Sequence, residues 1–489
     1  MKISNATLNQ LPEGISAPAY DRSALTPGIV HIGCGNFHRA HMAVYLDDLF
    51  ALGDHDWAIL GAGVREGDER MRKILEQQDY LSSVIELAPE GGSTRVVGAM
   101  TGFVPVAAGN KDLIAAMSDS RIRIVSLTVT EGGYYIDPKT GTFSPDHPDI
   151  RHDAANPAAP DTAFGAIIAA LKARRAGGLE PFTVMCCDNV PHNGHVTRDA
   201  VVGLAKLSDP ELADWIAANV AFPNSMVDRI TPATGPRELK MALDLGIEDK
   251  APVTCETFRQ WVIEDNFPAG RPALEKVGVT FTDAVDAYET MKIRILNGGH
   301  AIIAYPGGLR DIHYVHEAME DPQIRAFLSK VEDDEILPIV PPVPNTDLGD
   351  YKQLILDRCS NPEVADTVRR LCLDGSNRQP KFIIPSIRDV VAKGGDATGL
   401  ILLSALWCRY CFGTSENGSQ IEPNDPNWEK LTIVAAKAKD DPAAWLEMRE
   451  IYGDLGGNPA VASRFAELLR AVWAEGSQPV IQRYLDGTL

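Results

Sequence analysis

The chain lacks a hydrophobic run long enough to cross a membrane, and it lacks an excess of basic residues. Its longest apolar runs, such as 400–403, are far shorter than the ~20 residues that span a bilayer. Its N-terminus has no apolar core of the kind found in signal peptides. Acidic residues outnumber basic ones by 67 to 46, for a formal net charge of −21. Nucleic acids and anionic membranes attract basic surfaces, so we expect neither as a partner.

Cysteine is also scarce, with eight residues in a chain of 489. So few cysteines in so long a chain do not form a disulfide framework. Cys408 and Cys411 make a lone CxxC without a second pair, which favours buried, small apolar side chains over a zinc or redox site. We therefore expect a reduced, cytoplasmic protein with no bound metal.

What the chain does have is length, and 489 residues predict two large domains. Short apolar runs predict buried strands that alternate with helical patterns, which is typical of a parallel α/β sheet. From about residue 284 the pattern becomes mostly helical, so we place the boundary between 285 and 286. The segment 147–161, rich in Pro, Asp and Ala, predicts a surface loop. The expected strands are 28–33, 57–61, 122–129 and 182–187, and the expected helices are 37–52 and 162–175.

The turn after the first expected strand has the pattern of a phosphate-binding loop. It reads Gly33-Cys34-Gly35-Asn36-Phe37-His38, between a strand and a helix. Gly33 would permit the tight turn, and Gly35 would let backbone N–H groups reach a pyrophosphate. His38 replaces the usual third glycine. This context predicts that 1–285 is a Rossmann-type dinucleotide-binding domain, followed by a mostly α-helical substrate-binding and catalytic domain over 286–489.

The residues after the second expected strand bear on the choice of cofactor. Glu66 or Asp68 could accept hydrogen bonds from the adenosine ribose and would repel a 2′-phosphate. Arg65 beside them could instead pair with that phosphate. The pattern favours NAD over NADP.

The segment from Lys292 to His300 combines three polar side chains with two glycines. An α-helix would place Lys292, His300 and Asn297 at roughly 0°, 80° and 140° around its axis, on one side of an apolar helix. Glycine in mid-helix costs about 1 kcal/mol against alanine, so Gly298 and Gly299 suggest that something approaches the backbone closely. Such a set could bind and deprotonate an alcohol. Equally, the lysine could extend to solvent while the other two satisfy hydrogen bonds in the core.

Six segments, taken together, resemble the polyol-specific long-chain dehydrogenases of the mannitol dehydrogenase type. The resemblance runs nearly end to end, and several matches in one order are far more specific than any one of them. The segments are Gly33 to His41, Thr128 to Tyr134, Cys187 to Gly194, Asp228 to Pro232, Lys292 to His300 and Asp374 to Phe382.

The resemblance implies metal-independent, NAD-dependent interconversion of D-mannitol and D-fructose by a protein that acts as a monomer. Lys292 would be the general acid/base, acting with Asn297, His300 and Asn189, and Glu289 would help to move protons to solvent. As a base, Lys292 would need a pKa lowered from about 10.4 toward neutrality. Substrate contacts would come from Asp228, Arg378 and Lys381. Cofactor contacts would come from Ile32, Gly33, Gly35, Asn36, Phe37, Arg65, Glu66, Asp68 and Glu131.

Other interpretations stay open. Arg378 and Lys381 could clamp a carboxylate, as a fructuronate or tagaturonate reductase of the same family would need. Arabinitol or sorbitol oxidation is a closer alternative, and an NAD-binding sensor without catalysis is a remote one. Several residues also have purely structural interpretations: His38, Arg39 and His41 as braces of the first helix, Glu131 as a buried hydrogen-bonding group, Asp228 and Arg229 as an ion pair, and 332–335 as a solvated acidic face.

Overall fold

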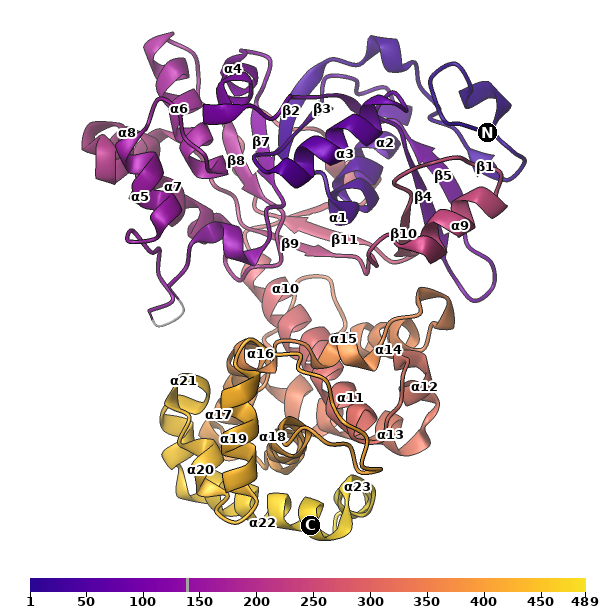
Figure 1. Cartoon of the computed structure of the whole chain (residues 1–489), viewed down its shortest axis with the longest axis vertical. Helices are drawn as coiled ribbons and strands as arrows, with labels where there is room; N and C mark the ends of the chain where they lie inside the picture. The colour runs from indigo at the N-terminus through magenta and orange to yellow at the C-terminus, as the bar shows by residue number, and fades with distance from the viewer. Residues whose placement is uncertain (138–139) are drawn as a thin grey trace. The chain divides into compact units, whose positions relative to one another are not determined.

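The computed structural model describes residues 1–137 and 140–489, except for the side chain of Glu131. The chain forms two compact units, Met1–Val285 and Asp286–Leu489, drawn in Figure 1 from indigo to pink and from pink to yellow. The first unit holds three sheets, and the second is built from helices.

A five-stranded, all-parallel sheet in the order β6-β3-β2-β7-β8 organises the first unit. Alternate residues of its central strands pack into two different cores: Ile29 and Ile124 on one face, Val30 and Val125 on the other. Burial on both faces explains why these strands are short, continuous apolar runs. The predicted parallel sheet is confirmed. Its strands are β2 (Pro27–Ile32), β3 (Ala58–Ala62), β6 (Met100–Phe103), β7 (Ile124–Leu127) and β8 (Thr183–Cys186).

Two smaller sheets complete this unit, and the sequence did not predict them. Each combines parallel and antiparallel pairs, with β4 antiparallel to β5 and β9 antiparallel to β11. One has the order β1-β5-β4-β10, and the other β12-β11-β9. The strands are β1 (Ile15–Ser16), β4 (Ser82–Leu87), β5 (Thr94–Val97), β9 (Ser225–Asp228), β10 (Val253–Glu256), β11 (Gln260–Ile263) and β12 (Thr280–Phe281).

The helices of the first unit correct two expectations. The segment 147–161 contains a helix, α5, which Pro148 begins and which the His147 ring caps by accepting from the Asp149 N–H. The helix expected over 37–52 is broken at His41, whose φ of −118° and ψ of −90° separate α1 from α2. The helices are α1 (Asn36–Ala40), α2 (Met42–Ala51), α3 (Glu66–Glu76), α4 (Lys111–Ser118), α5 (Pro148–Ala155), α6 (Ala163–Ala176), α7 (Asn193–Ser208), α8 (Pro210–Asn219) and α9 (Pro236–Asp244).

The second unit is helical, as the sequence predicted. Its first long helix runs from α10 through a π-helical turn, Lys292–Asn297, into α11. The helices are α10 (Val285–Met291), α11 (Gly298–Leu309), α12 (Val315–Glu320), α13 (Pro322–Val331), α14 (Leu348–Cys359), α15 (Val368–Cys372), α16 (Gly375–Phe382), α17 (Ile384–Ala392), α18 (Thr398–Cys411), α19 (Trp428–Ala438), α20 (Ala443–Leu446), α21 (Arg449–Tyr452), α22 (Pro459–Glu475) and α23 (Ser477–Asp486).

The acidic segment 332–335 is only half solvated, so the expectation of a solvated face was wrong for two of its four residues. Asp333 and Asp334 are exposed, whereas Glu332 and Glu335 are buried. The segment belongs to a second π-helical turn, Glu332–Ile336. Glu335 accepts hydrogen bonds from the N–H groups of Gly399 and Leu400, at 2.6 and 2.8 Å. It thereby caps α18, the most buried helix of this unit.

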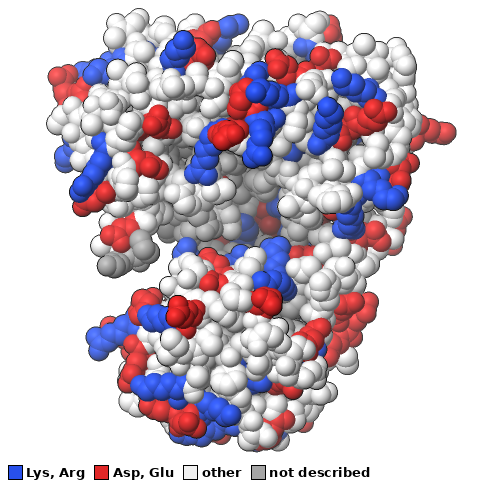
Figure 2. Space-filling model, viewed as in Figure 1, with Lys and Arg blue, Asp and Glu red and all other residues white. Residues whose placement is uncertain are grey.

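The distribution of surface charge and the lengths of the helices bear on the possible partners of the protein. Acidic and basic side chains are interspersed over the face shown in Figure 2. Within the described residues, every helix is too short or too polar to cross a membrane.

We expect Glu335→Ala to lower the free energy of unfolding by about 2–3 kcal/mol, because it leaves two buried N–H groups and the Tyr484 hydroxyl without their acceptor. Urea unfolding followed by circular dichroism would measure this change. Asp334→Asn, a change at an exposed residue of the same turn, should shift stability by less than about 0.5 kcal/mol. Equal effects of the two variants would contradict the capping role.

Candidate active site

The turn after β2 begins at the C-terminal edge of the parallel sheet, where ligands of such folds bind. Gly33 has a φ of +101°, and a Cβ at this position would lie 2.1 Å from the carbonyl oxygen of Thr128. Gly35 has a φ of −73°, and a Cβ there would meet nothing within 4 Å. Other protein atoms therefore fill the space beside Gly33, whereas the space beside Gly35 is empty. The first N–H groups of α1 have no intrahelical acceptor, so this open space suits a pyrophosphate.

His38 occupies the position of the missing third glycine and packs against the strand. Its ring stacks on that of His31, with centroids 3.5 Å apart. His31 contacts Ser126 Oγ at 2.7 Å and Thr128 Oγ1 at 2.9 Å, which ties β2 to β7. Burial lowers the pKa of His31 to about 3 and that of His38 well below its usual range, so both rings are neutral. Together with buried Arg39 and His41, they brace α1.

Other side chains of this turn link it to a neighbouring loop. The Asn36 amide donates to the Pro232 carbonyl at 3.0 Å and to Thr234 Oγ1 at 2.8 Å. Phe37 stacks on His41 and is half-buried, and Ile32 is buried in the last position of β2.

The loop after β7 and the residues after β8 are joined by a carboxylate that the sequence analysis did not single out. Asp188 accepts from the N–H groups of Val129 and Thr130, at 2.8 and 3.0 Å, and from the Tyr134 hydroxyl at 2.5 Å. Thr130 has a φ of +68°. Asn189 follows directly, with an exposed side chain. Asp188 stands in a segment that carried the family resemblance, but only the structure shows what it binds.

The residues after β3 form the start of α3. Asp68 Oδ2 accepts from the N–H groups of Val64 and Arg65, both at 3.0 Å, and so caps this helix. Arg65 and Glu66 are exposed at the same edge of the sheet. Glu131, also expected near the cofactor, has its side chain outside the described part of the structure.

The π-helical turn changes the expected geometry of the Lys292 segment. The Gly298 N–H donates to the Ile293 carbonyl, five residues back. The α-helical angles expected over 292–297 were therefore wrong, because the wider turn holds one more residue. Lys292 and Asn297 lie one π turn apart, and His300 follows Asn297 by about one α turn. Lys292 is 7% exposed, and the other two side chains are half-buried.

The neighbours of this turn account for one of the two glycines that follow it, Gly299. A Cβ at Gly298 would make only ordinary contacts, at 3.7 Å or more. A Cβ at Gly299 would lie 2.9 Å from Oε1 of Glu332. The group that closely approaches this backbone, within the described residues, is thus a buried carboxyl of the same unit.

The remaining expected site residues lie on several elements. Glu289 is on α10, one turn before Lys292, and is half-buried. Asp228 is the last residue of β9, in the first unit, and is 5% exposed. Arg378 and Lys381 are three residues apart on α16, and Arg378 donates to the carbonyls of Arg370 and Leu371. Arg229, which directly follows β9, donates to main-chain carbonyls and pairs with Glu86.

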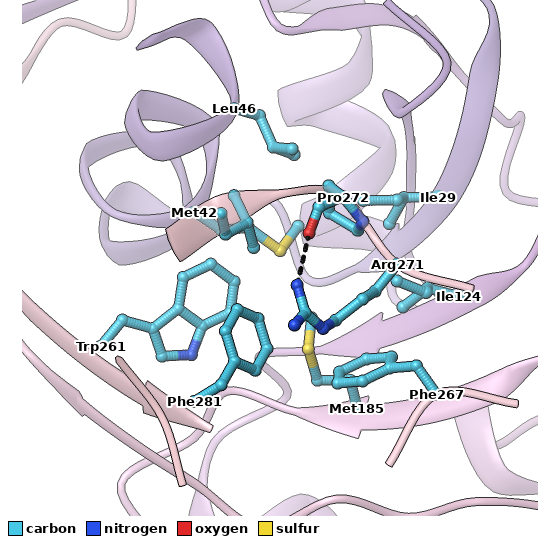
Figure 3. Close-up of a pocket in the computed structure, with 11 residues that line it drawn as sticks. Ile29, Met42, Leu46, Ile124, Met185, Trp261, Phe267, Arg271, Pro272 and Phe281 are labelled. Atoms are coloured by element: carbon cyan, nitrogen blue, oxygen red, sulfur yellow. Dashed lines mark hydrogen bonds between the residues drawn. The ribbon is translucent and has the colours of Figure 1, made fainter. Parts of the chain in front are cut away.

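A small apolar pocket of the first unit does not suit a sugar alcohol (Figure 3). It lies against the face of the sheet that carries Ile29, Ile124 and Met185. Arg271 lines this pocket and donates to the Pro272 carbonyl at 3.2 Å. Its guanidinium carbon lies over the Phe281 ring, 3.5 Å from the ring centroid. Its mainly aliphatic and aromatic lining offers few groups to a polyol's hydroxyls.

Comparison with known proteins assigns the whole chain to one family. The model of the mannitol dehydrogenase Rossmann domain matches residues 27–276, and that of the mannitol dehydrogenase C-terminal domain matches residues 284–473. The chain belongs to the mannitol dehydrogenase family. The resemblance seen in the sequence is thereby confirmed, as is the expected fold of a Rossmann domain followed by a mostly helical one.

Individual members of the mannitol dehydrogenase family match nearly end to end. A mannitol 2-dehydrogenase of Cereibacter sphaeroides is 67% identical over 97% of this chain and 100% of its own length. The Pseudomonas fluorescens mannitol 2-dehydrogenase, solved as a ternary complex with NAD and D-mannitol, has a TM-score of 0.89 and 42% identity, over 99% of this chain and 100% of that one. A D-sorbitol dehydrogenase solved in substrate-free form has a TM-score of 0.90 and 34% identity, over 98% and 100%.

The two glycines of the β2 turn allow a matched test. Gly33→Ala should lower the free energy of unfolding by about 1–3 kcal/mol, because it combines a positive φ with a backbone clash. Gly35→Ala should leave thermal stability unchanged but weaken NADH binding about tenfold or more, because its methyl group enters the space where the backbone would approach the phosphates. NADH fluorescence titration and thermal unfolding would measure both. Unchanged NADH affinity in Gly35→Ala would contradict this placement of the cofactor.

Proposed function

We propose that this enzyme oxidises D-mannitol to D-fructose with NAD, and catalyses the reverse reduction, with Lys292 as the general acid/base. The observation that carries the proposal is the buried lysine one π turn from Asn297, followed by His300, in a chain 67% identical to a mannitol 2-dehydrogenase. The mannitol and NAD complex of a 42% identical enzyme supports the same substrate and cofactor.

In this proposal the alcohol proton goes to the Lys292 amine, not to a metal-bound base. NAD, when bound, supplies the acceptor for the hydride. Asn297 donates an amide hydrogen bond that stabilises the negative charge developing on the reacting oxygen, and we propose the same role for Asn189. His300 orients a hydroxyl of the substrate. Glu289, one turn before Lys292, would exchange the proton with solvent.

We infer that the first unit holds NAD and that the second unit supplies the acid/base. Gly33, Gly35, Asn36 and Phe37 would position the pyrophosphate, with Ile32 below them. The open space above Gly35 supports this fit. Exposed Glu66 would accept hydrogen bonds from the ribose hydroxyls, whereas Asp68 is already engaged as a helix cap. A carboxylate at this point favours NAD over NADP, although the neighbouring Arg65 could pair with a 2′-phosphate.

Further proposals concern the state of the protein. Eight free, buried cysteines support a reducing, cytoplasmic compartment. We propose a monomer whose partner is a small polyol or ketose. Asp228 is proposed to contact the substrate or shape its pocket.

The second candidate function is hexuronate reduction, and two basic residues of α16 support it. Arg378 and Lys381 lie on one side of this helix and could bind a carboxylate together. A neutral hexitol would instead use them as hydrogen-bond donors.

A substrate panel tests the proposed function directly. With NADH, we expect the purified protein to reduce D-fructose faster than fructuronate or tagaturonate, and NADPH to be a poorer coenzyme. In the oxidative direction we expect mannitol to exceed sorbitol and arabinitol in kcat/KM. The decrease or increase of NADH absorbance measures each rate. Preference for a uronate would replace the proposal by hexuronate reduction, and tight NADH binding without turnover on any of these compounds would indicate a sensor.

The role of Lys292 is tested by Lys292→Met, with Lys437→Met as a control at an exposed lysine of α19. Loss of the acid/base should lower kcat by about 10²- to 10⁴-fold in both directions. Binding of NADH, followed by fluorescence, should persist because the cofactor residues belong to the other unit. Near-normal turnover of Lys292→Met would show that Lys292 is not the general acid/base.

A further inference from the structure

Glu332 is a buried acid for which the proposed reaction has no use. It is the first residue of the π-helical turn 332–336, and its side chain is fully buried. Neither carboxyl oxygen has a hydrogen-bond partner among the described residues. This isolation contrasts with Glu335 on the same turn, which accepts three hydrogen bonds. A carboxyl without partners in such a place is costly to ionise.

The Glu332 carboxyl lies against the helix that carries the proposed catalytic residues. A methyl group on Gly299 would come within 2.9 Å of Oε1 and 3.4 Å of the Leu328 side chain. Gly299 stands between Asn297 and His300. The two π-helical turns, 292–297 and 332–336, also contact each other. The carboxyl therefore fills a space that exists only because residue 299 has no side chain.

Few charges act on this carboxyl. Lys352 favours its ionised form and Asp333 opposes it, but the Lys352 ammonium already binds Ser329 Oγ at 2.8 Å and Asp333 at 2.6 Å. Burial dominates and raises the pKa of Glu332 to about 8. At neutral pH the group is a neutral carboxylic acid.

We propose that Glu332 is a positioning residue of the enzyme: its neutral carboxyl, seated beside Gly299, fixes the packing of the helix that presents Asn297 and His300. The inference rests on the proposed catalytic set. Ionisation would place an unpartnered charge beside this backbone, so the carboxylate would move out of the space beside Gly299. The helix would then lose this packing contact.

The proposal predicts a descending alkaline limb in mannitol oxidation. Lys292 must be deprotonated to accept a proton and gives the ascending limb, whereas Glu332 must stay protonated and gives the descending one. Arg294 is held by Asp389 at 2.6 Å. The titratable or charged groups on the segments around Glu332 include Lys292, Arg294, His300, Arg325, Lys330, Asp333, Asp334, Glu335, Lys352, Arg388 and Asp389.

A double-mutant cycle tests the contact. We expect Gly299→Ala and Glu332→Ala each to lower kcat by about 10-fold, since small displacements of catalytic groups have large effects. In the double variant the new methyl group enters the space left by the carboxyl, so the loss should stay near 10-fold and not reach about 100-fold. NADH affinity should not change. Additive losses would overturn the proposal.

The pH profile separates positioning from simple packing. Glu332→Met keeps the length of the side chain without a titrating group, so it should retain most of the turnover at pH 7 and lose the descending limb. Asp334→Asn, which removes an exposed charge from the same turn, should keep that limb. An unchanged limb in Glu332→Met would overturn the proposal, even if Gly299→Ala does not fold.

Lys292→Met distinguishes failure of this inference from failure of the proposed function. If Lys292→Met retains turnover, the catalytic set itself is wrong. If Lys292→Met is inactive while the Gly299 and Glu332 effects add, only the positioning role is wrong.

Discussion

The close approach of the β2 turn to the end of β7 is the constraint on which the C-terminal edge of the parallel sheet depends. The Thr128 carbonyl oxygen occupies the space that a side chain at Gly33 would need. The His31 ring then joins Ser126 and Thr128 to β2, and Asp188 joins the loop after β7 to the residues after β8. Three parallel strands are thereby held in register at their C-terminal ends by side chains as well as by their ladders.

The second unit uses buried acids in two different ways. Glu335 receives hydrogen bonds from the first N–H groups of α18, so its carboxyl replaces the intrahelical acceptors that a helix start lacks. Glu332, three residues earlier, has no such donors among the residues that the structure describes, and it packs as a neutral group against Gly299. Glu332 and Glu335 are three residues apart on this turn, and both are buried, whereas the two residues between them are exposed.

Much of the fold could be predicted because its central strands are buried on both faces. Such strands read as continuous apolar runs, and four of them lie within a few residues of the expected ranges. The strands of the two smaller sheets, including the six-residue β4, were missed, because pairs such as β4 with β10 join segments far apart in the sequence. Helix α5 was missed because a proline that begins a helix has the same sequence signal as a proline in a loop.

The candidate site was predicted in its residue types but not in its geometry. The sequence alone determined the family and the glycine turn, and it supplied Lys292, Asn297 and His300 as the proposed catalytic residues, because these depend on residue identity and order. Only the tertiary structure decided that the lysine turn is π-helical, that Asp188 holds the loop after β7, and that Glu332 is buried. Each of these depends on which distant backbone or side chain supplies, or fails to supply, a partner, and local sequence does not contain that information.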